Sequence, residues 1–169
     1  MKKLFMVGVL GLALGITGVF AQHPGGLGIG IQGGYGLGGG ETALSLKVPS
    51  LPVYWAINLF IGENVFALGV SGDVYLIDTS LVPDIGLGWY FGIGGYGHLN
   101  FWGSGSGHDG VGIGLGARLP VGLSWFIPGL PIPLELYLQA HVGLGIIVGS
   151  GFRFPDPSFG GNFGVRVWL

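Results

Sequence analysis

A strict alternation of apolar and non-apolar residues between Val111 and Trp125 constrains the fold of this chain more than any other feature. Every odd position in this run is apolar, and every even position carries Gly, Arg, Pro or Ser. A period of two is typical of a β-strand, because an α-helix would spread the same apolar residues around its whole circumference. The run therefore predicts a strand with one apolar face, longer than most strands of soluble proteins.

The same alternation recurs along the chain. From Leu134 to Val148 one face is again entirely apolar. Shorter runs, separated by turn-forming residues, bring the predicted number of strands to eight. These shorter runs are Leu27–Leu37, Thr42–Val48, Val53–Ile61, Val65–Ile77, Asp84–Ile93 and Asn162–Leu169. The predicted fold class is all-β.

The placement of charge separates a soluble sheet from a membrane sheet. Only 8% of the residues are charged, and 39 are Gly. After residue 21, every charged residue lies on the non-apolar face of a predicted strand or in or beside a connection. A lipid-facing column penalises a charge by roughly 2–4 kcal/mol at the middle of the bilayer. Because lipid leaves no strand edge unpaired, we predict an eight-stranded antiparallel transmembrane β-barrel.

Residues 1–21 form a predicted signal peptide. Lys2 and Lys3 supply a basic start, Leu4–Gly18 is apolar, and Val19–Ala21 forms a small-x-small cleavage site. The barrel domain then covers 22–169, and a barrel exported through the inner membrane is expected in the outer membrane. The absence of Cys excludes disulfides and thiolate chemistry. Eight acidic and six basic residues leave no basic footprint for nucleic acid.

The end of the chain has the spacing of an assembly signal. Its apolar residues alternate in a pattern that resembles the C-terminal signature of bacterial outer-membrane barrels, which usually end in Phe. The mature length resembles the small eight-stranded barrels of the OmpA, OmpX and OmpW kind, and Gly116–Ser124 with Leu134–Tyr137 is similar to a spirochaetal barrel family of unknown function. These resemblances imply that both chain ends face the periplasm. They also imply that the outer-membrane assembly machinery recognises Phe163, Val165, Val167 and Leu169.

Polar residues on the inward faces are the first candidate functional set. Buried charges need partners, so we expect a polar network in the periplasmic half and middle of the lumen. Its predicted members are Lys47, Asp73, Arg118, Glu135, Gln139, His141 and Arg166. Inward glycines predict an open outer half. Two interpretations remain: a gated pore or ligand cup, and a structural polar core in which Gly eases sheet curvature.

Two longer connections on the outer side, Asn100–Gly110 and Gly149–Gly161, supply the second candidate set. Exposed aromatic and charged residues there suit contact with an extracellular protein or with outer-membrane lipid, and packing within the loops explains them equally well. The candidates are Phe101, Trp102, His108, Asp109, Phe152, Arg153 and Phe154.

The sequence shows no catalytic or metal-binding set. Ser, His and Asp occur together between Ser104 and Asp109, but adjacent His and Asp side chains in a Gly-rich loop are poorly placed for a proton relay. The histidines at 98, 108 and 141 share no ligand spacing. We therefore predict a non-enzymatic outer-membrane barrel, without cofactor or metal, that is structural or binds a surface partner through its outer loops. The alternative is a narrow pore or transporter for a small or apolar ligand.

Overall fold

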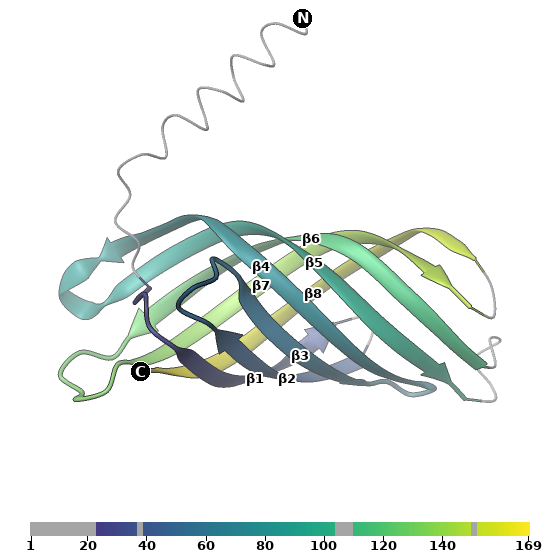
Figure 1. The fold of residues 1–169 in the computed structure, drawn as a ribbon, viewed down its shortest axis with the longest axis horizontal. Helices are drawn as coiled ribbons and strands as arrows, with labels where there is room; N and C mark the ends of the chain where they lie inside the picture. The colour runs from purple at the N-terminus through teal and green to yellow at the C-terminus, as the bar shows by residue number, and fades with distance from the viewer. Residues whose placement is uncertain (1–22, 37–38, 104–109, 150–151) are drawn as a thin grey trace, which may run out of the picture.

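The computed structural model describes residues 23–36, 39–103, 110–149 and 152–169. Within these ranges, antiparallel strands β1 to β8 follow each other in one closed barrel, and β8 pairs with β1 (Figure 1). Among the same residues, no helix is both long and apolar enough to cross a membrane. The elements are β1 (Gly28–Gly36), β2 (Gly39–Lys47), β3 (Tyr54–Ile61), β4 (Val65–Val82), the 3₁₀ turn η1 (Pro83–Ile85), β5 (Leu87–Trp102), β6 (Gly110–Phe126), β7 (Leu134–Val148) and β8 (Arg153–Trp168). The predicted all-β fold is confirmed.

The period-two pattern gives the barrel an apolar exterior and a polar interior. In β6, Ile113 and Leu115 point outward and are exposed, whereas Arg118 and Ser124 point inward and are buried. The other strands repeat this arrangement, with isoleucine, leucine, valine and phenylalanine among the most exposed side chains of the molecule. A soluble barrel has the opposite arrangement, with its apolar face buried.

The start of β1 and the end of β8 lie together at one end of the barrel, which we call the terminal end. Leu27 and Leu169 exchange backbone hydrogen bonds of 2.9 and 2.7 Å there, so the β1–β8 pairing continues to the last residue. The connections β2–β3, β4–β5 and β6–β7 lie at the same end, and the other four connections lie at the opposite, distal end. This up-and-down order agrees with the predicted topology.

The barrel wall is uneven in height. Strands β1 to β3 have 8 or 9 residues each, whereas β4 to β8 have 15 to 18. The β1–β8 ladder ends at Gly36 and Gly160, so Arg153–Phe159 pairs with β7 alone. Pro155 and Pro157 lie in this segment, and proline is typical of an unpaired strand edge because it has no N–H to offer. The long strands therefore project beyond β1 and β2 at the distal end (Figure 1).

Three of the predicted connections are partly strand in the structure. Strand β5 continues to Trp102 and β8 begins at Arg153, so much of Gly149–Gly161 and part of Asn100–Gly110 are strand. The connection predicted at Asp78–Pro83 is mostly the end of β4. Gly, Pro and Asp are typical of turns, but hydrogen bonds from a neighbouring strand hold them extended here. The predicted signal peptide, 1–21, lies outside the described residues.

Candidate functional site in the barrel lumen

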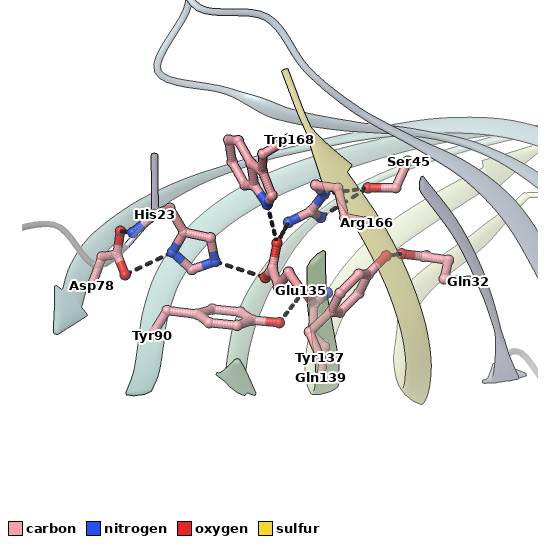
Figure 2. Close-up of polar contacts among 10 residues, drawn as sticks. All are labelled: His23, Gln32, Ser45, Asp78, Tyr90, Glu135, Tyr137, Gln139, Arg166 and Trp168. Carbon is pink, nitrogen blue, oxygen red and sulfur yellow. Dashed lines mark hydrogen bonds and ion pairs between the residues drawn. The ribbon is translucent and has the colours of Figure 1, made fainter. Parts of the chain in front are cut away.

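A buried carboxylate, Glu135, organises the lumen near the terminal end (Figure 2). The alternation of β7 turns its side chain inward. Arg166 Nη1 and Trp168 Nε1, both from β8, donate to Glu135 Oε2 over 2.8 Å each. Arg166 Nη2 also donates to Ser45 Oγ of β2 over 2.8 Å. A carboxylate removed from water needs such charge-assisted hydrogen bonds to remain ionised.

The third partner of Glu135 is His23, which precedes β1. Its Nε2 lies 2.8 Å from Glu135 Oε1, and its Nδ1 lies 2.7 Å from Asp78 Oδ1 of β4 (Figure 2). Burial alone would lower the pKa of His23, but hydrogen bonds to the two carboxylates outweigh burial and raise that pKa above 6.5. Both ring nitrogens face an acceptor, as an imidazolium requires. We call His23, Asp78, Glu135 and Arg166 the terminal charge cluster.

Aromatic rings fill the space around the terminal charge cluster. Tyr54, Tyr75 and Tyr90 stack in a row, with ring centroids 4.0 and 4.2 Å apart. The Arg166 guanidinium carbon lies 4.6 Å from the centroid of the Tyr137 ring, a favourable cation–π distance. Together with the terminal charge cluster, these rings fill the terminal half of the lumen.

A second ion pair lies nearer the middle of the lumen. Arg118 of β6 donates through Nε and Nη2 to the two carboxylate oxygens of Asp73 on β4, over 2.8 and 2.7 Å. This two-point contact fixes the relative orientation of both side chains. Gln139 accepts a hydrogen bond of 3.1 Å from Tyr90 Oη and so joins this level to the aromatic row.

Two residues of the predicted network lie apart from these pairs. Lys47 Nζ donates to the carbonyl oxygens of Val48 and Leu51 in the β2–β3 connection, over 3.0 and 2.6 Å. His141 lines the lumen, but its Nδ1 has no hydrogen-bond partner in the part of the chain that the structure describes. Within those ranges, no group of three or more His, Asp or Glu side chains could hold a metal ion.

Sequence reasoning missed two members of the terminal charge cluster. His23 lies outside every strand, so strand parity gives it no direction. Asp78 was expected in a connection because Asp and Ser precede Pro83 there. One sequence feature could have drawn attention to His23: it is the histidine between residue 21 and Glu41, and histidine titrates near neutral pH.

Several inward glycines are covered by rings from the adjacent strand. Tyr96 of β5 lies across its cross-strand partner Gly116, and His98 lies across Gly114. A methyl group added at either glycine would overlap the ring. Tyr137 lies across its partner Gly164 and His141 across Gly160, while the Trp102 ring lies over Gly112, two residues beyond its partner Gly110. These glycines therefore make room for rings, and the space that stays open in the distal half is lined mainly by other side chains.

The first group of predicted outer contacts lies at the end of β5. Phe101 points outward, with its ring centroid 5.8 Å from that of Phe66, and Trp102 points into the lumen. Because they belong to a strand, these two residues do not form a loop surface. His108 and Asp109 lie outside the described residues.

The second group lies at the start of β8. Phe152 precedes the strand, and Arg153 and Phe154 are its first residues. Both phenylalanines are exposed. Arg153 Nη1 lies 3.6 Å from Asp156 Oδ1 on the same strand. This group therefore forms a projecting strand end, which we call the distal rim.

The predicted assembly signature lies at the end of β8. Phe163, Val167 and Leu169 face the exterior, while Arg166 and Trp168 between them point into the lumen. One short segment thus supplies both the apolar exterior and part of the terminal charge cluster. Recognition of Phe163, Val165, Val167 and Leu169 by assembly machinery stays a prediction.

Comparison with known proteins identifies the fold. No family model matches this chain, and no curated protein matches it, so the resemblances to OmpA-like and spirochaetal families stay predictions. The crystal structure of Neisserial surface protein A is similar, with a TM-score of 0.52 and 13% sequence identity over 85% of this chain and 96% of that chain. The chain therefore has the fold of a small eight-stranded β-barrel of the type found in this surface protein.

Proposed function

We propose that this chain is an outer-membrane β-barrel whose terminal end faces the periplasm and whose distal end faces outward. The apolar exterior supports insertion in a bilayer, because the exposed side chains of Ile31, Ile57 and Val142 would otherwise contact water. An even number of strands puts both chain ends on the same side of the membrane. The orientation rests on the behaviour of barrels of this class.

Within the membrane, the barrel acts as a non-enzymatic scaffold for surface binding. The filled terminal half of the lumen is the observation that carries this proposal. Glu135 and Tyr90 have no exposed surface, and Trp168 is almost fully buried. A pore needs a continuous passage, and opening one here would strand buried charges of the terminal charge cluster.

The distal rim is the proposed contact surface for an extracellular protein. Phe152 and Phe154 are 74% and 61% exposed, on either side of Arg153 in the sequence. Aromatic side chains and Arg are enriched where proteins contact one another. Outer-membrane lipid is the other candidate partner for the same side chains.

Adhesion of bacteria that express the barrel to an epithelial monolayer tests the distal rim. We expect the double variant Phe152→Ala/Phe154→Ala to reduce adhesion. The matched control is Leu130→Ala/Ile132→Ala, which removes two exposed apolar side chains at the terminal end. Protease treatment of the monolayer should abolish the difference if the partner is a protein. Equal adhesion of both double variants and the unaltered barrel would contradict the proposal.

Conductance in planar bilayers tests the scaffold against the narrow pore or transporter. We expect the purified barrel to give no steady current, because side chains fill the terminal half of the lumen. A steady current that increases in Glu135→Ala would reject the scaffold and favour the pore.

A further inference from the structure

Two hollows that share part of their lining occupy the distal half of the lumen, on the distal side of the Asp73–Arg118 pair. The larger has a volume of about 280 Å³, and we call it the distal cavity. Its lining includes Phe60, His98, Asn100, Trp102, Asp156 and Ser158. The smaller, the inner pocket, has a volume of about 60 Å³ and adds Asn58, Tyr96 and His141.

Buried hydrogen-bonding groups in both hollows lack partners. Asn100 and Ser158 are only 4% and 8% exposed. Folded proteins pair nearly all such groups with protein atoms or with ordered water. Six of the eight such atoms without a partner among the described residues line the hollows: Asn100 Nδ2, His98 Nε2 and Ser158 Oγ in the distal cavity, and Asn58 Oδ1, Tyr96 Oη and His141 Nδ1 in the inner pocket. The other two belong to Asn162. The terminal half pairs its charged groups internally, so this cluster marks a different kind of space.

The charges around the hollows favour an uncharged occupant. Arg118 is held by Asp73, and the carboxylate of Asp156 lies 3.6 Å from Arg153 and offsets its charge, so the hollows carry no excess of positive charge. Glu41 adds a carboxylate to the inner pocket, which repels anions and accepts hydrogen bonds from hydroxyl groups. The cluster offers both donors and acceptors, and a hydroxyl group can serve both.

The apolar part of the lining favours an organic ring over water alone. Phe60, Ile147 and the ring carbons of Trp102 form walls of the distal cavity that offer no hydrogen bond to water. Small-molecule sites combine such apolar walls with a few polar groups and range from roughly 300 to 1,000 Å³. The volume of the distal cavity lies near the lower limit of that range. It suits a ligand with one ring and is too small for an oligomer of several rings.

We propose that the distal cavity binds one ring of a neutral sugar, with His98, Asn100 and Ser158 contacting its hydroxyl groups and Trp102 and Phe60 packing against its C–H face. The ligand is small and polar, whereas the transporter predicted from the sequence would carry a small or an apolar ligand. Binding here requires neither the orientation nor the protein partner proposed for the distal rim. The two proposals can therefore fail separately.

Saturation-transfer NMR on the full barrel tests this proposal, in a zwitterionic detergent that has no sugar headgroup. The probes are glucose, galactose and N-acetylglucosamine at tens of millimolar, with glucosamine and glucuronate as cationic and anionic comparisons. We expect signal from at least one neutral sugar and at least about tenfold weaker binding in Asn100→Ala/Ser158→Ala. The matched control, Asn64→Ala/Ser50→Ala, changes the same residue types at exposed positions and should bind like the unaltered barrel.

Three results would overturn the proposal. The first is the absence of signal from every neutral sugar, which would mean that water alone fills the cavity. The second is binding of a charged probe only. The third is equal binding by the cavity variant and the control variant. If the cavity variant does not fold, Trp102→Phe keeps an aromatic wall and provides a second measurement. A sugar-dependent change in tryptophan fluorescence should then disappear, and its persistence would place the sugar elsewhere.

Discussion

At the scale of single residues, Glu135 shows what a carboxylate requires inside a narrow barrel. Its donors are His23 from the start of the described chain and Arg166 and Trp168 from its end. The same carboxylate thus balances two cationic side chains. Without it, Arg166 still has neutral neighbours such as Ser45 and Tyr137, which do not balance its charge.

The variant Glu135→Ala should therefore lower the free energy of unfolding by about 3–5 kcal/mol, because a cation remains buried without its partner. Urea unfolding of the refolded barrel, followed by tryptophan fluorescence, measures this loss. Glu63→Ala, in the exposed β3–β4 turn, serves as the control and should leave stability unchanged. A loss no larger than that of the control would mean that water screens the lumen charges.

The pH dependence of stability provides a test of His23. Because its pKa in the folded barrel lies above 6.5, its imidazolium stabilises the fold fully below pH 6.5. This contribution is lost as pH rises through the raised pKa. In the unaltered barrel, the urea midpoint should decline as pH rises from about 5 to about 9, a range that brackets the titration of an ordinary His. His23→Asn should flatten that decline, and an unchanged profile would show that His23 is neutral.

At the scale of elements, sequence periodicity predicted all eight strands and the inward direction of Arg118, Glu135 and Arg166, because alternation is a local property of a strand. It did not predict the lengths of β4, β5 and β8, since those depend on which neighbour supplies hydrogen bonds. It could not place His23, which has no strand parity. It also could not show that Lys47 turns back to nearby carbonyl oxygens.

The pairing of inward rings with inward glycines makes a prediction of its own. Gly116→Ala should cost about 1–3 kcal/mol of stability, because the new methyl group overlaps the Tyr96 ring. The additional change Tyr96→Ala should remove most of that overlap, so the two substitutions should be non-additive in urea unfolding. At Gly33→Ala, the control, the nearest atom would lie 3.9 Å from the methyl group. Purely additive effects would contradict the contact.

At the scale of the whole molecule, an apolar exterior and paired chain ends together specify how the barrel would lie in a membrane. The terminal end carries the Val48–Leu51 turn, and the distal end carries the β5–β6 connection. The two are on opposite sides of the proposed membrane. Their accessibility in living cells therefore reports orientation directly.

A short epitope inserted in the β5–β6 connection should bind antibody on intact cells. The same epitope inserted after Ser50 should bind only after the outer membrane is made permeable. Immunofluorescence before and after permeabilisation distinguishes the two positions, and equal total amounts of both proteins on a denaturing gel provide the control. The opposite pattern would reverse the proposed orientation.

The meeting of the two chain ends also has a kinetic consequence. Leu27 bonds to Leu169, and His23 bonds to Glu135, so these contacts join residues that lie far apart in the sequence. Hairpins such as β7–β8 can assemble early, because their contacts are local, whereas closure joins residues at the greatest sequence separation. The buried acid of β7 remains short of one cation until the first strand arrives. Ring closure and the pairing of these buried charges are therefore a single late event.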